Sequence, residues 1–155
     1  MTDDRQDFGV LLSLASVTFA QELRDHMHDA GFIGFTTRTG FVLRLLLTEP
    51  LSLRGLADRL HMTPQATLKL VDGMALAGFV DRATSMRDRR LRMVQVNDRG
   101  RAALDAAKGF HQKFELDLAA DVGEAAAADV RRALELLANR TPVSVPGGRR
   151  SARRR

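Results

Sequence analysis

The sequence contains no cysteine, no tryptophan and no tyrosine. The absence of cysteine excludes a disulfide framework, thiolate-ligated zinc and any thiol redox switch. Phenylalanine supplies all the aromatic residues, 5% of the chain, so a cation-binding cage of tryptophan and tyrosine is excluded as well. The chain has 155 residues, of which 45% are hydrophobic and 28% charged. This is the composition of one folded domain, with room for an oligomerisation extension.

Lysine is also scarce, and the basic charge is carried mainly by arginine. The formal net charge is +5, from 24 basic and 19 acidic residues. Five arginines fall within residues 149–155, so the rest of the chain balances 19 basic against 19 acidic side chains. This excludes a uniformly basic, histone-like coat. Residues 141–155, rich in proline, glycine and arginine, are expected to be a disordered tail that adds salt-sensitive affinity for a polyanion.

The longest apolar run is too short to cross a membrane. Residues 8–20 resemble the core of a signal peptide, but the residues before them are net acidic. The run is also shorter than the roughly 20 residues that a membrane-spanning helix needs. We therefore expect a buried helix in a cytoplasmic protein that makes no membrane contact. No phosphate-binding glycine loop, metal-binding histidine pair or nucleophile elbow occurs, so the sequence predicts no enzyme, no cofactor and no metal.

Apolar spacing and capping residues predict a mainly α-helical fold. Helices are expected over residues 7–30, 36–49, 53–60 and 64–77. Ser52 and Thr63 stand at N-cap positions, and Pro64 follows where its missing N–H costs nothing. Pro50 and Gly78 end the helices that precede them.

After Gly78 the hydrophobic period changes from helical to alternating. Residues 79–82 and 91–96 are predicted to form the two strands of a small β-hairpin. Asn97 then caps a long helix over residues 98–121. The fold class is therefore mainly α with a β-hairpin wing.

Two apolar surfaces indicate a partner chain. The helix over residues 7–30 is apolar on two faces, and a last helix is expected over 123–140. The long helix also carries a stripe with the heptad spacing of a coiled-coil seam. Its members are Ala103, Ala107, Phe110 and Phe114.

A short helix, a tight turn, a capped helix and a hairpin form a winged helix-turn-helix. Residues 51–104 resemble the MarR family of bacterial transcriptional regulators. The resemblance rests on Leu56, Ala57, Leu60, Leu70, Val71, Asp72, Met74, Gly78, Phe79, Val80, Arg82, Asp88, Arg89, Arg90 and the V-x-V-N-x-x-G run at 94–100. It implies a DNA-binding region over 36–97 and a helical dimerisation region over 7–35 and 98–140. The implied function is that of a homodimeric repressor that acts on pseudo-palindromic operators.

The hairpin turn concentrates positive charge. Residues 82–92 hold one acid, Asp88, and five arginines: Arg82, Arg87, Arg89, Arg90 and Arg92. Arginine on a thin hairpin suits the narrow minor groove of A·T-rich DNA, although a charged turn is otherwise usually just solvated. The resemblance implies that Asp88 braces the wing against Arg90 or Arg82, while Arg89 or Arg90 enters the groove. A purely local turn-forming role for Asp88 stays open.

The helix over 64–77 corresponds to the recognition helix. Gln65 suits adenine and Ala66 suits a thymine methyl group, while Lys69 and Thr63 suit phosphates. Gln65 and Lys69 are otherwise ordinary solvent-facing residues.

The family pattern has a hydroxyl residue at the position of Leu68. In this sequence the hydroxyl residue, Thr67, stands one position earlier, so the two residues are exchanged relative to the pattern. Leu68 is then either a thymine-methyl contact or the sign of a rotated helix. Asp72 is expected on the same outer face.

Many proteins of this family release DNA when a small aromatic or phenolic anion binds between the dimer helices and the DNA-binding region. By this resemblance, such an effector pocket is expected to be lined by Phe32, Phe35, His26 and His61. Two other functions stay open. One is a degenerate winged helix that binds another protein, motivated by Leu68 and the neutral body. The other is a non-specific DNA binder driven by the arginine tail.

Overall fold

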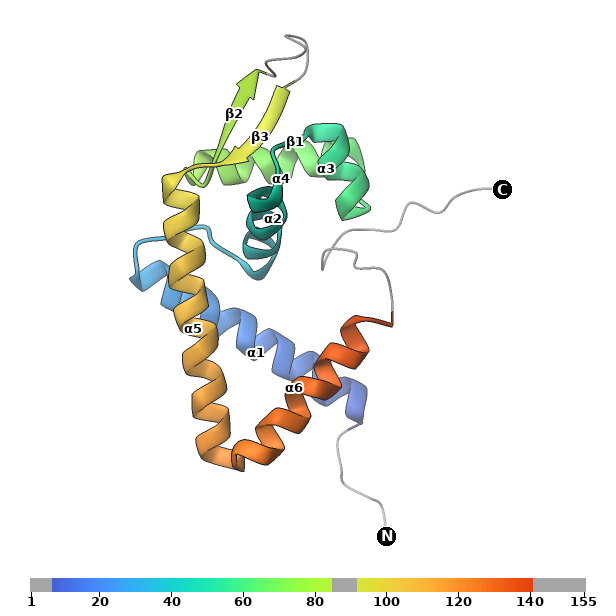
Figure 1. Ribbon diagram of the computed structural model, residues 1–155, viewed down its shortest axis with the longest axis vertical. Helices are drawn as coiled ribbons and strands as arrows, with labels where there is room; N and C mark the ends of the chain where they lie inside the picture. Colours follow the sequence, from blue (N-terminus) through green and yellow to red (C-terminus); the bar gives the residue numbers. More distant parts are fainter. Residues whose placement is uncertain (1–6, 85–91, 141–155) are drawn as a thin grey trace, which may run out of the picture.

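The computed structural model describes residues 7–84 and 92–140, which form six helices and three strands (Figure 1). The helices are α1 (Phe8–Asp29), α2 (Thr37–Thr48), α3 (Leu53–Leu60), α4 (Pro64–Leu76), α5 (Asp98–Val122) and α6 (Glu124–Ala138). The strands are β1 (Leu51–Ser52), β2 (Val80–Thr84) and β3 (Arg92–Val96). The mainly helical fold with a small antiparallel sheet confirms the predicted fold class.

Side chains cap the start of four helices. The caps are Thr36, Ser52, Thr63 and Asn97. At α4, Thr63 Oγ1 accepts a hydrogen bond from the amide of Ala66 at 3.2 Å, and Pro64 occupies the first helical position. Each cap satisfies an amide that the helix itself leaves open. The three caps predicted from sequence, at α3, α4 and α5, are confirmed.

The sheet contains one strand more than predicted. Its strand order is β1-β3-β2, and both pairings are antiparallel. β2 and β3 form the predicted hairpin, with Val80 opposite Val96. β1 was not predicted: Leu51 pairs with Val94, far along the chain. A strand of two residues shows no hydrophobic period, so the local sequence holds no signal for it.

The main core lies where the sheet meets α2, α3, α4 and the first turns of α5; we call this part of the molecule the reading head. Its fully buried side chains include Val42, Leu43, Leu56, Leu60, Val71, Phe79 and Val94. The rest, formed by α1, the second half of α5, and α6, is the helical end. α5 joins the two parts, and α6 folds back from its far end (Figure 1).

α5 starts so close to the sheet that its first turn requires glycine. A Cβ atom on Gly100 would clash with the carbonyl oxygen of Phe79 and would lie 2.8 Å from Cγ1 of Val96. Carbon cannot approach either atom so closely, and the Phe79 oxygen is fixed in the backbone. Gly100 therefore sets how α5 leaves the reading head.

The stripe on α5 packs inside its own chain. Ala103 and Ala107 are fully buried, and Phe110 is only 8% exposed. The ring centroid of Phe19 on α1 lies 5.6 Å from that of Phe110 and 5.1 Å from that of Phe114. The predicted coiled-coil seam between chains is therefore wrong. Heptad spacing shows that a face is covered, and here Phe19 on α1 of the same chain covers Phe110 and Phe114.

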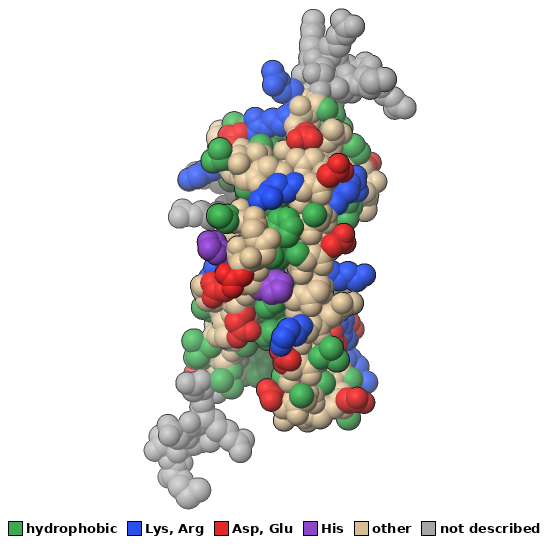
Figure 2. Space-filling model, turned by 90° about the vertical axis from the view of Figure 1, so that its left-hand side faces the viewer, with side chains coloured by type: hydrophobic (Ala, Val, Ile, Leu, Met, Phe, Trp, Pro, Cys, Tyr) green, Lys and Arg blue, Asp and Glu red, His purple; other side chains and the backbone are tan. Residues whose placement is uncertain are grey.

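Most of the other apolar residues of the helical end are exposed in the single chain. They include Phe8, Val10, Leu11, Leu12, Leu14 and Val17 on α1, and Val130, Leu134 and Leu136 on α6. In Figure 2, hydrophobic side chains gather around a hollow in the lower half of the molecule. Across residues 7–84 and 92–140, no helix combines the length and the hydrophobicity needed to cross a membrane.

Candidate nucleic-acid interface

α4 is held in the reading head by one face and presents the other face to solvent. Thr67, Val71 and Met74 are buried on the inner face. The outer face carries the residues expected there, all exposed: Gln65, Ala66, Leu68, Lys69 and Asp72. The helix is thus fixed by packing, and its outer face is available for contact.

A tight turn between α3 and α4 sets the start of this helix. His61 caps α3 with a left-handed φ of +50°, a conformation that strains residues other than glycine. Two hydrogen bonds hold the turn: the His61 amide donates to the Asp58 carbonyl at 3.3 Å, and the Met62 amide to the Ala57 carbonyl at 3.0 Å. His61 is therefore part of the helix-turn-helix geometry.

An ion pair ties the hairpin to α4. Arg82 on β2 donates a hydrogen bond to the carboxylate of Asp72 on α4. The sequence predicted that either Arg82 or Arg90 pairs with Asp88. Within the described residues, Arg82 pairs with Asp72. The other predicted wing residues, Arg87, Asp88, Arg89 and Arg90, lie outside the described residues.

Arg99, which sequence reasoning missed, joins the reading head to the end of α1. Its Nη2 donates to the carbonyl of Gly31 at 2.8 Å, and its Nε donates to the carbonyl of Ala77 at 3.2 Å. Its guanidinium carbon also lies 5.3 Å from the ring centroid of Phe32 and 5.7 Å from that of Phe79, within cation–π range. One side chain at the start of α5 therefore holds the ends of α1 and α4 together.

The four residues predicted for an effector pocket do not converge on one cavity. Phe35 is buried and packs edge-on against Phe79, with ring centroids 5.9 Å apart. Phe32 lies under Arg99, and the exposed His26 lies 5.3 Å from Phe110, centroid to centroid. His61 caps α3. Phe35 thus serves the core, and an effector pocket at these four residues stays a prediction.

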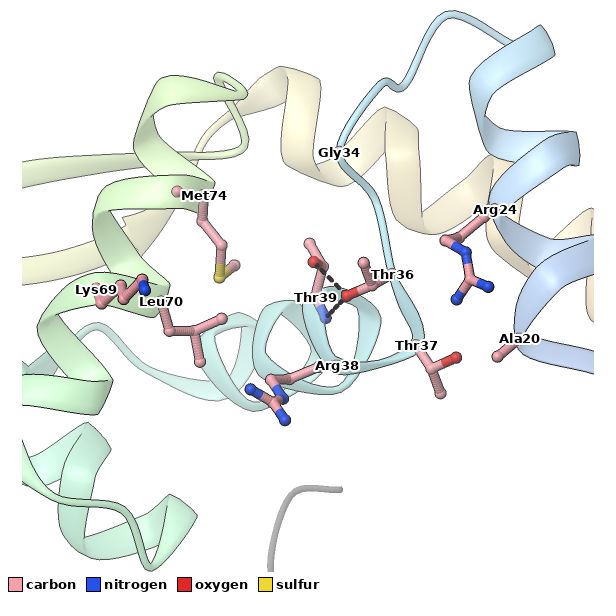
Figure 3. Close-up of a pocket in the computed structure, with 11 residues that line it drawn as sticks. Ala20, Arg24, Gly34, Thr36, Thr37, Arg38, Thr39, Lys69, Leu70 and Met74 are labelled. Atoms are coloured by element: carbon pink, nitrogen blue, oxygen red, sulfur yellow. Dashed lines mark hydrogen bonds between the residues drawn. The ribbon is translucent and has the colours of Figure 1, made fainter. Parts of the chain in front are cut away.

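A different groove lies between the reading head and α1 (Figure 3). It has a volume of about 600 Å³, and none of the four predicted residues lines it. α1 contributes Ala20 and Arg24 on one side, α4 contributes Lys69, Leu70, Gly73 and Met74 on the other, and residues 34 and 36–39 lie between them. Three basic side chains, Arg24, Arg38 and Lys69, border it. The groove therefore suits an anion with an apolar part.

One titratable residue at the junction of the two parts has a shifted pKa. The ring of His111 on α5 stacks on Phe19 at 5.5 Å between centroids. Burial lowers the pKa of His111 below its usual value, and the positive charge of Arg44 lowers it further. Within the described ranges, no group of three or more His, Cys, Asp or Glu residues is placed to hold a metal ion.

Comparison with known proteins identifies the winged helix. The MarR family model matches residues 33–91. Among curated proteins, no sequence matches this chain. The fold resembles a MarR-family transcriptional regulator from Rhodococcus sp. RHA1, with a TM-score of 0.65 at 22% identity, over 91% of this chain and 100% of that one.

Two further solved structures are similar. The S. aureus MepR–DNA complex matches with a TM-score of 0.66 at 15% identity, over 88% of this chain and 100% of that one. Wild-type MarR of E. coli in its apo form matches with a TM-score of 0.64 at 16% identity, over 86% and 98%. The MarR family model thus matches the winged-helix part of this chain, residues 33–91, and the described chain has the fold of these solved structures.

Proposed function

We propose that this chain is a transcriptional regulator that binds double-stranded DNA. The observation that carries the proposal is α4, which is buried on one face, is capped at its start and presents Gln65 and Lys69 on its exposed outer face. A helix mounted in this way beside a hairpin suits the major groove. The likeness to MepR, whose structure is that of a DNA complex, supports the same function.

The outer face of α4 supplies contacts of two kinds. Gln65 pairs with adenine through its amide, and Ala66 lies against a neighbouring base. Lys69, the Thr63 hydroxyl and the open amides at the start of α4 bind phosphates, which position the helix but do not read sequence. The Asp72–Arg82 pair holds the hairpin at a set angle to the helix, so that the wing reaches the adjacent minor groove.

The proposed contacts of the wing rest on the sequence alone. Arg89 or Arg90 enters the minor groove, Arg87 adds positive charge, and Asp88 supports the turn. Because narrow A·T-rich grooves attract arginine, the wing favours A·T base pairs beside each half-site.

The regulator acts as a homodimer. The support is the row of exposed apolar residues on α1 and α6, since an apolar surface of this extent usually marks an interface. Residues 7–35 and 98–140 form the dimerisation region, and residues 36–97 bind DNA. Two-fold symmetry then places two copies of α4 in successive major grooves, about 34–36 Å apart.

Selection from a random duplex library, followed by gel shifts at about 150 mM salt, tests this function. The full chain should enrich a pseudo-palindrome, and Arg89→Ala/Arg90→Ala should weaken binding at least tenfold. Arg149→Ala/Arg150→Ala is the matched control: it should flatten the salt dependence but leave the selected sequence unchanged. Enrichment of no sequence would favour a protein-binding winged helix instead, and unchanged affinity of the wing variant would contradict the wing role.

Repression relieved by a small anion is the finer part of the proposal. Arg24, Arg38 and Lys69 border the groove between α1 and α4, and Lys69 also belongs to the DNA-facing side of the helix. An aromatic carboxylate in this groove would neutralise Lys69 and withdraw it from the phosphates. 4-Hydroxybenzoate should therefore lower DNA affinity, and the uncharged 4-hydroxybenzamide should not. Equal effects of the two compounds would contradict a charge-based site.

A further inference from the structure

Two neighbouring residues of α4 have the reverse of the usual burial: the polar residue is buried and the apolar residue is exposed. Thr67 is fully buried, and its hydroxyl donates a hydrogen bond to the carbonyl of Thr63 at 3.0 Å. Leu68, which has no polar side-chain atom, is 42% exposed. A core is stabilised more by burying leucine than by burying threonine. The stability of the reading head therefore does not explain an apolar side chain at position 68. A contact with another molecule would explain it.

Leu68 shares its surface with the residues proposed to read DNA. Gln65 precedes it by three positions, so the two side chains lie on one face of the helix. Both line an open groove of about 720 Å³ between α3 and α4. Leu53, Arg54, Ala57, Asp58, Met62 and Pro64 form the rest of the groove. The floor beside the Gln65 amide is thus largely apolar.

The charges nearby favour DNA over an apolar protein partner as the occupant. Arg54 borders the groove, and Lys69 follows Leu68 on the exposed side of α4. Basic side chains around an apolar contact suit a base edge flanked by phosphates. A hydrophobic peptide would remove water from both cations without supplying an anion, which opposes that alternative.

We propose that Leu68 is a specificity-determining residue that selects thymine through its C5 methyl group. Thymine is the one base that presents a methyl group in the major groove, beside its O4 acceptor, whereas the other bases present hydrogen-bonding groups without a methyl group. A leucine against such an edge leaves those groups without a partner, which is unfavourable. Each half-site therefore requires thymine opposite Leu68, next to the adenine that Gln65 reads. This inference rests on the proposed DNA-binding function and names a base that it recognises.

Replacing thymine by deoxyuridine tests the inference, because the change removes only the methyl group. The full chain is first used to select a duplex from a random library, and each thymine of that duplex is then replaced singly by deoxyuridine. For the wild-type chain, one position in each half-site should lose about fourfold in affinity, the value of one buried methyl group. For Leu68→Ala, the same replacement should have no effect.

Leu76 provides the matched control. It is a second exposed leucine on α4, 92% exposed, at the opposite end of the helix from Gln65. Leu76→Ala should keep the wild-type sensitivity to deoxyuridine. If Leu68→Ala keeps it as well, or if the selected half-sites hold no methyl-sensitive thymine, the role of Leu68 is overturned while DNA binding stands. If no duplex is enriched, both proposals fail together.

Discussion

The reading head and the helical end bury their apolar residues to very different extents. Five of the twelve residues of α2 are buried, against two of twenty-two in α1 and one of fifteen in α6. The difference does not come from a lack of apolar residues, since α1 alone has six large ones that stay exposed. The reading head thus completes its core within one chain, whereas the helical end leaves exposed the apolar surface that we propose for dimerisation. Substitutions in the helical end should therefore affect self-association, whereas substitutions in the reading head should affect the free energy of unfolding.

The largest effect is expected from charge on α1. Leu14 and Val17 are exposed and lie on one face of the helix. In a dimer, Leu14→Arg/Val17→Arg would bury two unpaired charges, which should weaken self-association about a thousandfold or more. Sedimentation equilibrium should show a monomer whose reading head remains folded. Leu76→Arg, at an exposed position on the reading head, should leave the mass of the assembly unchanged. A dimer that survives the α1 substitutions would place the interface elsewhere.

The next effect in size is expected inside the reading head. Gly100→Ala places a methyl group against the Phe79 carbonyl oxygen, so the free energy of unfolding should fall by about 3 kcal/mol. Gly109 lies on the same helix, and a Cβ atom added there would meet no atom within 4 Å apart from the neighbouring backbone of its own helix. Gly109→Ala should therefore raise the free energy of unfolding by up to about 1 kcal/mol. Urea unfolding of both variants measures the contrast, and equal stabilities would refute the close approach of α5.

A smaller loss is expected at the connection between the two parts. Arg99→Met keeps the aliphatic stem but removes the hydrogen bonds to Gly31 and Ala77. The free energy of unfolding should fall by about 1–2 kcal/mol. Amide exchange should quicken at the ends of α1 and α4, while the middle of α2 stays protected. Arg101→Met, exposed on the same turn, is the control. Exchange that quickens uniformly would show that Arg99 acts on overall stability and does not join the two parts.

The same contrast explains what could be predicted from the sequence. Helix starts were predictable because a cap such as Ser52, Thr63 or Asn97 bonds to its own backbone three residues later. β1 was not, since its partner strand lies far along the chain. The stripe around Phe110 was predicted as a buried face, but its partner was misjudged. A periodic pattern shows that a face is covered without showing which element covers it.

The groove was missed for a related reason. Arg24, Arg38 and Lys69 lie far apart in the sequence, on three helices, and no motif links them. The expectation of an aromatic lining pointed instead to Phe35, which is a core residue. Arg99 could have been suspected, because it stands in the first turn of a long helix, just after the cap at Asn97. Its two partners, however, become visible only when α1 and α4 are placed in space.

The smallest effect is expected from pH, at the boundary between the two parts. Burial and the charge of Arg44 lower the pKa of His111 in the folded chain, and His26 also lies beside the shared Phe110 ring. The unfolded chain keeps the ordinary pKa of about 6.5, so it takes up the proton first as the pH falls. The free energy of unfolding should therefore be constant above that value and decrease below it, until the folded chain also becomes protonated. Urea unfolding at several pH values should show this decrease for the wild type and for His28→Gln, an exposed control. His111→Gln should flatten it, and an unchanged decrease in that variant would assign the effect to another group.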